Sequence, residues 1–202
     1  MKASVAIKHC VERRGLLDDM LVALGGAPVR VYTDVHKHGT WTTTRRCLAG
    51  MPSWATHVIV LDDDLLLCKD FLGGAVRAAS QRPECVVSFW AKNPHVDKKA
   101  SSGDRWVSVD YVQGPAVCFP RAVAEGLLIY AGHVEQGADD AHVTDYCKKH
   151  GVARWTTMPS LVEHLCPNDS LVQNRKADRS HRVASRFIGA EVSALSIDWS
   201  VA

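Results

Sequence analysis

The segment THVIVLDDDLLLCKDF, residues 56–71, places three consecutive aspartates directly after an apolar run. The run HVIVL has the length and the β-branched residues of a buried strand, so it predicts a strand that ends at Asp62. Because side chains alternate along extended backbone, Asp62 and Asp64 can point to one ligand while Asp63 faces elsewhere. Neighbouring carboxylates repel one another, and a divalent cation such as Mg²⁺ or Mn²⁺ would neutralise them. The alternative is a solvated turn in which the aspartates cap the next helix.

Strands and helices are predicted to alternate along the rest of the chain. We expect strands near residues 4–9, 28–34, 57–61, 85–90 and 105–112, and a strand that runs into a loop over 153–164. We expect helices near residues 16–24, 40–49, 71–80, 119–130 and 137–151. The polar stretch 91–105 is predicted to be a loop. This pattern favours a single α/β domain with a mostly parallel central sheet flanked by helices. Such sheets bind ligands at the carboxyl ends of their strands, which is where the three aspartates lie.

Composition is that of an ordinary globular protein. The chain has 202 residues, of which 47% are hydrophobic and 23% are charged, so it can bury one substantial core. A net charge of +2 is too small to indicate a polyanionic partner by itself. Seven cysteines without a CxxC pair favour reduced thiols over a disulfide framework. The N-terminal sequence lacks the pattern of a secretory signal and no run is long enough to span a bilayer, so we expect a cytoplasmic protein without a membrane span.

The stretch VIVLDDDLLLCKDF resembles the DxD segment of GT-A fold glycosyltransferases, in which a strand delivers the acidic motif. The order of the other elements is also similar, from about residue 4 to residue 166. The resemblance implies a single GT-A (Rossmann-like) catalytic domain over residues 1–170. It leaves a basic extension over residues 171–202 that binds the acceptor or packs on the domain. In such enzymes Mn²⁺ or Mg²⁺ holds the diphosphate of a nucleotide sugar.

The same resemblance implies which residues bind the metal and the donor. Asp64 and Asp62 are the implied metal ligands, and Asp62 and Asp63 are also assigned to the donor. His164, in the run PSLVEH, is similar to a histidine that completes the metal shell in many family members. Glu163 would then orient His164 instead of binding the metal. The alternative for His164 is a structural or surface residue.

A second acidic group lies in the segment EQGADDAH. Asp139 and Asp140 fall at the start of a predicted helix, where the helix dipole favours carboxylates, so capping explains one of them. In inverting members of the family a paired acidic motif at this place supplies the general base. The resemblance therefore implies Asp140 as the base, with Asp139 or Glu135 in reserve. The family's usual pattern has Glu before Asp, and here Asp139 stands where that Glu would be.

Further residues are assigned to the donor. Lys8 and Asp34 end the first two predicted strands, where nucleotide pockets usually form. The alternative for each is an exposed residue at the end of a strand. Gly114, in VQGPAV, is similar to a glycine that lies under the donor sugar, and the alternative is a plain turn. Arg45 and Arg46 would suit the geometry of a phosphate, or they belong to a solvated helix face. We assign Arg46 to the donor.

The acceptor is predicted from basic residues that alternate with tryptophans. Trp90, Lys92 and Trp106 border the polar stretch 91–105, and the basic run QNRKADRSHRVASRFIG carries Arg175 and Arg179. Such residues suit stacking on an extruded base or on a sugar ring, together with contacts to phosphates.

We therefore expect a metal-dependent, inverting glycosyltransferase that uses a nucleotide sugar, with a UDP-sugar as the family's commonest donor. A compact domain without a membrane anchor resembles the small phage glycosyltransferases that modify hydroxymethylated pyrimidines such as 5-hydroxymethylcytosine in DNA. The resemblance implies DNA as the leading acceptor and the host cytoplasm as the location. One alternative is a transferase that acts on a surface glycan or a lipid-linked sugar. Another is a non-enzymatic module that binds a metal or a partner.

Overall fold

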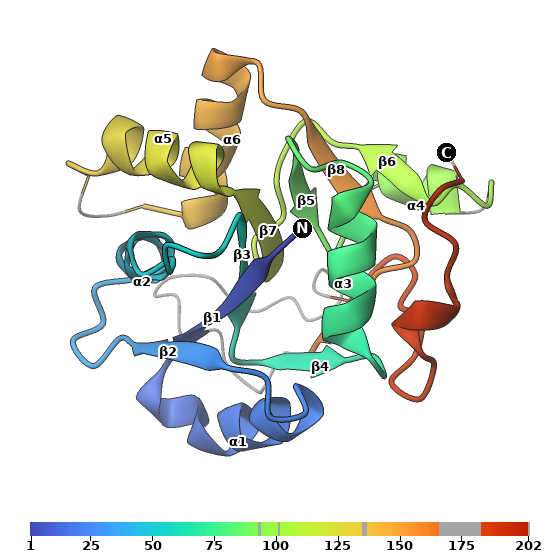
Figure 1. The fold of residues 1–202 in the computed structure, drawn as a ribbon, viewed down its shortest axis with the longest axis horizontal. Helices are drawn as coiled ribbons and strands as arrows, with labels where there is room; N and C mark the ends of the chain where they lie inside the picture. Colours follow the sequence, from blue (N-terminus) through green and yellow to red (C-terminus); the bar gives the residue numbers. More distant parts are fainter. Residues whose placement is uncertain (93, 101, 135–136, 166–182, 202) are drawn as a thin grey trace.

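A computed structural model of the chain describes residues 1–92, 94–100, 102–134, 137–165 and 183–201, and it shows a single α/β domain (Figure 1). The centre is a seven-stranded sheet with the strand order β2-β1-β3-β7-β5-β8-β6. Its strands in chain order are β1 (Ala3–His9), β2 (Val29–Thr33), β3 (His57–Asp62), β5 (Val86–Ser88), β6 (Trp106–Ser108), β7 (Ala116–Pro120) and β8 (Arg154–Thr157).

Most strands of this sheet run in one direction. β1 pairs in parallel with β2 and β3, and β5 pairs in parallel with β8. β7 is antiparallel to both β3 and β5, so β5 runs in the same direction as β3, and β6 is antiparallel to β8. The predicted fold class, a mostly parallel sheet flanked by helices in one domain, is confirmed.

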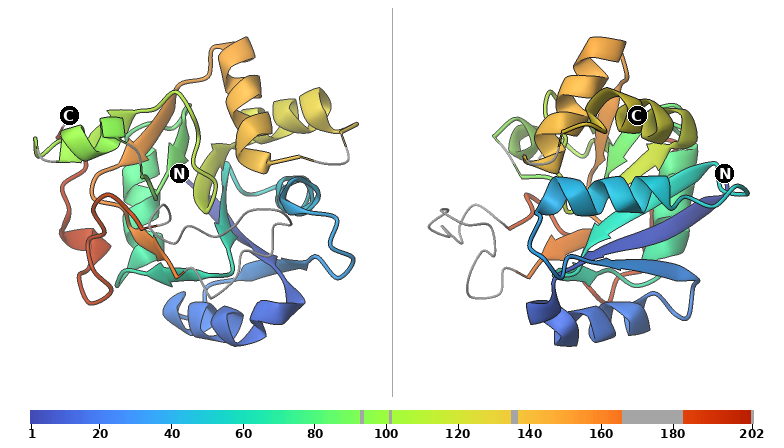
Figure 2. Two further views of the ribbon diagram at one scale, coloured as in Figure 1. Left: turned by 180° about the vertical axis from the view of Figure 1, so that it is seen from behind. Right: turned by 90° about the vertical axis from the view of Figure 1, so that its left-hand side faces the viewer.

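Helices cover both faces of the sheet. They are α1 (Arg14–Ala23), α2 (Thr40–Ala49), α3 (Phe71–Ser80), α4 (Pro94–Ala100), α5 (Arg121–Ala131) and α6 (Asp139–His150), with 3-10 turns η1 (Val11–Arg13) and η3 (Ala194–Ser196). Ile59 and Leu61 of β3 pack in one core with α1 and α3, and the alternate residues Val58 and Val60 pack in a second core with α2, α5 and α6. Figures 1 and 2 show α2, α5 and α6 grouped together.

A small second sheet lies beside the end of β3. It joins β4 (Leu65–Leu67) to β9 (Val162–His164) in antiparallel register, with Leu65 opposite His164. The backbone N–H of Leu165 donates to the carbonyl of Asp64 at 2.9 Å. The small sheet therefore brings His164 next to the acidic triplet.

The segment that we expected to form a turn and then a helix from residue 119 is strand β7, and helix α5 begins only at Arg121. The apolar run at 116–119 can be read as a buried strand or as the start of a helix, since periodicity does not separate the two in so short a run. β7 is fully buried because it lies between β3 and β5. Pro120 has an extended ψ of 148° and precedes the first turn of α5.

Three other boundaries differ from the prediction. The expected loop at 91–105 contains α4, and the strand expected at 105–112 is limited to the three residues of β6. The segment 153–164, expected to be a strand that runs into a loop, contains two strands, β8 and β9, which belong to different sheets. Short elements that are defined by their partners are not visible in local sequence patterns.

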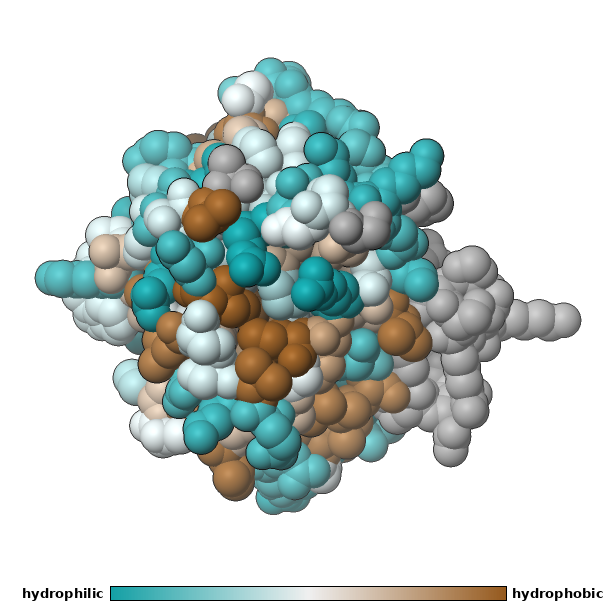
Figure 3. All heavy atoms as spheres, turned by 90° about the vertical axis from the view of Figure 1, so that its right-hand side faces the viewer, coloured by the Kyte–Doolittle hydropathy of each residue, from teal (hydrophilic) through white to brown (hydrophobic). Residues whose placement is uncertain are grey.

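The described residues near the C-terminus, 183–201, pack on the domain. Ala194, Ile197 and Trp199 are buried in the core that contains α3. A Cβ on Gly74 would lie only 2.1 Å from the Cβ of Ala194, so the glycine permits this close approach. Figure 3 views the side of the molecule where this segment lies, and hydrophobic residues there are interspersed with polar ones. Among the described residues, no helix has both the length and the apolar character to cross a lipid bilayer.

Candidate active site

Two carboxylates and an imidazole converge beside the carboxyl end of β3. Asp62 ends β3, Asp64 follows in the connection to β4, and His164 ends β9. One possible ligand atom from each of the three residues lies within 4.8 Å of the other two. The Nε2 atom of His164 lies 3.6 Å from Oδ2 of Asp64. This arrangement of oxygen and nitrogen atoms can hold a divalent cation.

Asp63 has different surroundings from its two neighbours. Its Oδ2 accepts a hydrogen bond from the backbone N–H of Cys10 at 2.6 Å and lies 2.8 Å from Nδ1 of His9. Its Oδ1 accepts from Nη1 of Arg13 at 3.1 Å, and only 2% of the residue is exposed. The carboxylate therefore binds the turn that follows β1, instead of facing the space where Asp62 and Asp64 meet.

Arg13 is part of the acidic cluster although the sequence did not indicate it. Its Nη1 lies 2.6 Å from Oδ2 of Asp64 in addition to its contact with Asp63. η1 follows β1, and β1 lies beside β3 in parallel, so residues that follow the two strands meet at one edge of the sheet. The pairing of β1 with β3 is the signal that would have identified Arg13.

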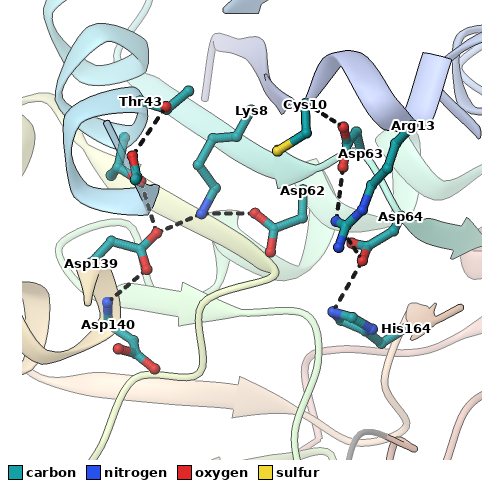
Figure 4. A network of polar contacts seen from close by, with 12 residues as sticks. Lys8, Cys10, Arg13, Thr43, Asp62, Asp63, Asp64, Asp139, Asp140 and His164 are labelled. Atoms are coloured by element: carbon teal, nitrogen blue, oxygen red, sulfur yellow. Dashed lines mark hydrogen bonds and ion pairs between the residues drawn. The ribbon is translucent and has the colours of Figure 1, made fainter. Parts of the chain in front are cut away.

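The second acidic pair lies at the start of α6 and is connected to the first cluster by Lys8 (Figure 4). The Nζ atom of Lys8 lies 2.5 Å from Oδ2 of Asp139 and 2.7 Å from Oδ1 of Asp62. Thr44 of α2 donates to Oδ2 of Asp139 at 2.8 Å, and the backbone N–H of Asp140 donates to Oδ1 of Asp139 at 3.0 Å. The carboxylate of Asp139 is therefore fully engaged by the protein.

The surroundings move the pKa values of these carboxyl groups apart. Burial raises the pKa of Asp62 to about 6; Lys8 opposes the increase, and the charges of Asp64 and Asp139 add to it. Burial acts on Asp139 as well, but the ammonium of Lys8 and the hydrogen bonds hold the pKa of that carboxyl below its usual value. Burial raises the pKa of Asp140, although a hydrogen bond from Tyr111 opposes the increase. Asp140 is thus the better proton acceptor of the α6 pair.

The pKa of Lys8 shows that its charge is retained. Burial works against the ammonium form, but the carboxylates of Asp139 and Asp62 outweigh it and raise the pKa of Lys8 above its usual range. Lys8 therefore carries a positive charge inside the site at every physiological pH.

A very small cavity, with a volume of about 10 Å³, lies between Lys8 and the start of α6. The residues that line it are Lys8, Thr44, Val60, Val112, Gly114, Val117, Phe119, Asp139, Asp140 and Val143. A Cβ on Gly114 would lie 3.6 Å from Oδ1 of Asp139 and 3.6 Å from the Cβ of Asp140. Gly114 therefore lies directly against the acidic pair.

The other residues assigned to the donor have protein partners. Asp34 accepts hydrogen bonds from the backbone N–H groups of His38 at 2.9 Å and Gly39 at 2.8 Å, so it closes the loop before α2. Arg46 donates to the carbonyl of Thr33 at 2.9 Å, whereas Arg45 donates to the carbonyl of Val134 at 3.1 Å. The two arginines diverge and do not form the pair that would suit one phosphate.

Trp90 lies beside the candidate metal ligands, with its ring centroid 6.3 Å from that of His164. The backbone N–H of Lys92 donates to the side chain of Gln113 at 2.6 Å, which ties the start of the 91–105 segment to the residue before Gly114. Glu163 accepts from the backbone N–H groups of His164 at 2.9 Å and Ala184 at 2.8 Å, and this braces the strand that carries His164.

Trp106 lies away from these residues. It is 6% exposed, its Nε1 donates to the carbonyl of Trp199 at 3.1 Å, and the guanidinium of Arg82 lies 4.8 Å from its ring centroid. The ring is part of the packing between β6 and the C-terminal segment. Three other predicted residues, Glu135, Arg175 and Arg179, lie outside the described residues.

The comparisons with known proteins identify the fold. No protein-family profile matches the chain, and no curated protein matches it in sequence. Among solved structures, it is similar to GalNAc-T7, crystallised with UDP, GalNAc and Mn²⁺, at a TM-score of 0.56 and 11% identity over 81% of this chain and 43% of that chain. It is also similar to A197 from STIV, at a TM-score of 0.50 and 12% identity over 81% of this chain and 84% of that chain.

These identities are too low to carry residue roles, and the chain spans less than half of the length of the GalNAc-T7 chain. The likeness is one of architecture: the order of strands and helices and the mostly parallel sheet. The chain has a GT-A-like, Rossmann-like α/β fold in a single domain.

Proposed function

We propose that the protein is a metal-dependent glycosyltransferase that moves a sugar from a nucleotide-sugar donor to an acceptor hydroxyl with inversion. The observation that carries the proposal is the convergence of Asp62, Asp64 and His164 within 4.8 Å. They converge next to a second acidic pair that contains a carboxyl group of raised pKa. A cation site and a proton acceptor on one GT-A-like scaffold are the two groups that this reaction needs.

The residues fit Mn²⁺ or Mg²⁺. Two carboxylates and one imidazole form a mixed set of oxygen and nitrogen ligands. Such a set suits Mn²⁺, whereas calcium sites are built from oxygen ligands alone. Charge favours a cation as well. Among the described residues, the five carboxylates of the connected network contact Lys8, Arg13 and the imidazoles of His9 and His164, so with neutral imidazoles they keep a formal excess of three negative charges. The raised pKa values of Asp62 and Asp140 are consistent with this excess.

Each side chain then has a role in the reaction. A bound Mn²⁺ or Mg²⁺ would neutralise the charge that develops on the leaving nucleoside diphosphate. Asp62, Asp64 and His164 would hold it. Asp140 accepts the proton of the acceptor hydroxyl while the hydroxyl oxygen attacks the anomeric carbon and the nucleoside diphosphate leaves. Inversion at the anomeric carbon follows from this single displacement. Asp139 stays ionised and keeps the first turn of α6 in place, because its carboxylate already binds Lys8 and Thr44.

The substrates are proposed more coarsely. A UDP-sugar is the first donor to test, since GalNAc-T7 was crystallised with UDP, GalNAc and Mn²⁺. Trp90 lies next to the candidate metal ligands with 8% of the residue exposed, so it is the aromatic group that we would test first for contact with a sugar ring. Hydroxymethylated DNA remains the acceptor that we would test first, and a glycan acceptor second.

The test combines the full chain and Mn²⁺ with a panel of nucleotide sugars. Acceptors are hydroxymethylated DNA, unmodified DNA and free oligosaccharides, and the readouts are released nucleoside diphosphate and a mass shift of the acceptor. We expect release that requires Mn²⁺ and stops with chelator. A mass shift on hydroxymethylated DNA alone would support the DNA acceptor, whereas a shift on oligosaccharides would replace it with a glycan. No release from any donor would overturn the proposal and favour a binding module.

A further inference from the structure

Lys8 is a buried lysine between the two acidic groups of the site. The residue is 7% exposed, and its Nζ lies 2.7 Å from Oδ1 of Asp62 and 2.5 Å from Oδ2 of Asp139 (Figure 4). The contact with Asp62 has the length of a charge-assisted hydrogen bond, and the contact with Asp139 is shorter still. The ammonium therefore has two ionic partners on elements that are far apart in the chain, β3 and α6.

The sheet fixes one half of this connection. In the register of β1 with β3, Lys8 lies directly opposite Asp62, so their side chains leave the sheet on the same face. The other half joins the sheet to α6, whose first residue, Asp139, follows Lys8 by 131 positions. Lys8 thus ties the rigid end of the sheet to the first turn of a helix.

Asp139 transmits this position to Asp140. Its Oδ2 forms an ion pair with Lys8 and accepts a hydrogen bond from the hydroxyl of Thr44. Its Oδ1 accepts a hydrogen bond from the backbone N–H of Asp140. A shift of the Asp139 carboxylate would therefore move the backbone of Asp140. The distance between Asp140 and the cation site depends on this chain of contacts.

We infer that Lys8 is a positioning residue that links Asp62 to Asp139 and so holds Asp140 at a set place relative to the cation site. The inference rests on the proposed function, because it assumes that Asp140 acts on a substrate near Asp62. It replaces the sequence-based expectation that Lys8 contacts the donor. A carboxylate has two oxygens, so the ion pair with Lys8 leaves Asp62 a second oxygen for a cation.

A direct role for Lys8 at the donor is disfavoured by its contacts. Its ammonium is buried and already bound to two carboxylates. Movement toward a phosphate would leave Asp62 and Asp139 without their shared cation, and an unpaired buried charge is strongly unfavourable.

The first test measures steady-state transfer by Lys8→Met, which keeps the length of the side chain and removes the charge. We expect kcat to fall about 10- to 100-fold, because misplacement of a catalytic group has effects of this size. We expect the KM for the nucleotide sugar to change less than about threefold, because no donor contact is removed. Lys148→Met, at an exposed lysine in the last turn of α6, is the matched control and should behave like the parent.

The second test covers the case in which Lys8→Met fails to fold. Thr44→Val keeps every charge and nearly the same shape but removes the hydrogen bond to Asp139. It should lower kcat about three- to tenfold without changing the KM for the donor. Thr44→Ser restores a hydroxyl and should recover most of the loss, which a simple packing defect would not allow.

The outcomes separate this inference from the proposed function. A donor KM that rises about tenfold in Lys8→Met with parent-like kcat would show a donor contact and overturn the inference alone. Parent-like kcat in both Lys8→Met and Thr44→Val would also overturn it alone. A parent protein that neither binds Mn²⁺ nor releases a nucleoside diphosphate would overturn the proposed function, and the inference with it.

Discussion

The end of β3 and the start of α6 both carry adjacent aspartates, and in each place the protein uses one of them for its own structure. At the end of β3, Asp63 is held by His9, Cys10 and Arg13, while Asp62 and Asp64 converge with His164. At the start of α6, Asp139 is held by Lys8 and Thr44, while Asp140 has a raised pKa.

The two places differ in how they separate neighbours. After β3 the chain bends at Asp63 and Asp64, and there Asp63 turns to Cys10 and Arg13 while Asp62 and Asp64 converge with His164. In α6 consecutive residues are about 100° apart around the axis, so Asp139 turns to the sheet and Asp140 does not. Adjacent identical residues can therefore have opposite roles, and the comparison predicts that substitutions of neighbours will have different effects.

The largest effect is expected from Asp64→Asn. The substitution keeps the shape of the side chain but removes the charge that a cation would bind, so Mn²⁺ affinity should fall about 100-fold or more. Titration with Mn²⁺ measures the affinity, and nucleoside diphosphate release should become undetectable. Parent-like Mn²⁺ affinity in a folded variant would contradict the assignment of the cation site.

Asp140→Asn should lower kcat about 10²- to 10⁴-fold while Mn²⁺ affinity and the KM for the donor stay close to those of the parent. An amide cannot accept the proton of the acceptor hydroxyl, but the groups that bind donor and cation are untouched. Single-turnover transfer measures the loss. Asp145→Asn, at an exposed position of the same helix, is the control. A parent-like kcat would remove Asp140 as the base.

Asp63→Asn should affect folding more than chemistry. It breaks the contacts of a buried carboxylate with Arg13 and His9, and the free energy of unfolding should fall by about 3 kcal/mol. Urea denaturation without metal measures this loss. The exposed Asp19→Asn should change the same quantity by less than about 0.5 kcal/mol. If Asp63→Asn left stability unchanged but abolished Mn²⁺ binding, the division of roles within the triplet would be wrong.

The smallest effect is a dependence of Mn²⁺ affinity on pH. The pKa of Asp62 is raised to about 6, so this group gains a proton as the pH falls through that value, and the proton competes with the cation. Affinity should be highest above about pH 7 and should decline by up to about tenfold for each unit below pH 6. Titrations between about pH 5 and pH 8 test this. In Asp62→Asn the slope should be shallower.

Local sequence patterns predicted the parts of the molecule that depend on neighbours in the chain. The strand at 57–61 could be predicted because its apolar, β-branched run is typical of a buried strand. Asp63 points away from Asp62 and Asp64 as expected, although β3 ends at Asp62 and the chain bends at Asp63 and Asp64. The start of α6 at Asp139 could be predicted because carboxylates favour the first turn of a helix.

Other contacts could not be predicted because their partners are distant in the chain. The contact between Lys8 and Asp139 spans 131 positions, and that between Thr44 and Asp139 spans 95. Arg45 and Arg46 were expected to suit one phosphate together, but they donate to different carbonyls. The sequence could have indicated this, because consecutive residues of a helix do not share a face.

Because β4 pairs with β9, binding of a cation at Asp62, Asp64 and His164 would indicate that the whole domain has folded. Asp62 and His164 belong to strands about a hundred positions apart, and the small two-stranded sheet brings the imidazole to the acidic triplet. An unfolded or partly folded chain has no preassembled site, so the cation adds its binding energy to the completed structure alone. Occupancy by Mn²⁺ during refolding should therefore appear late, after the two halves of the central sheet have joined.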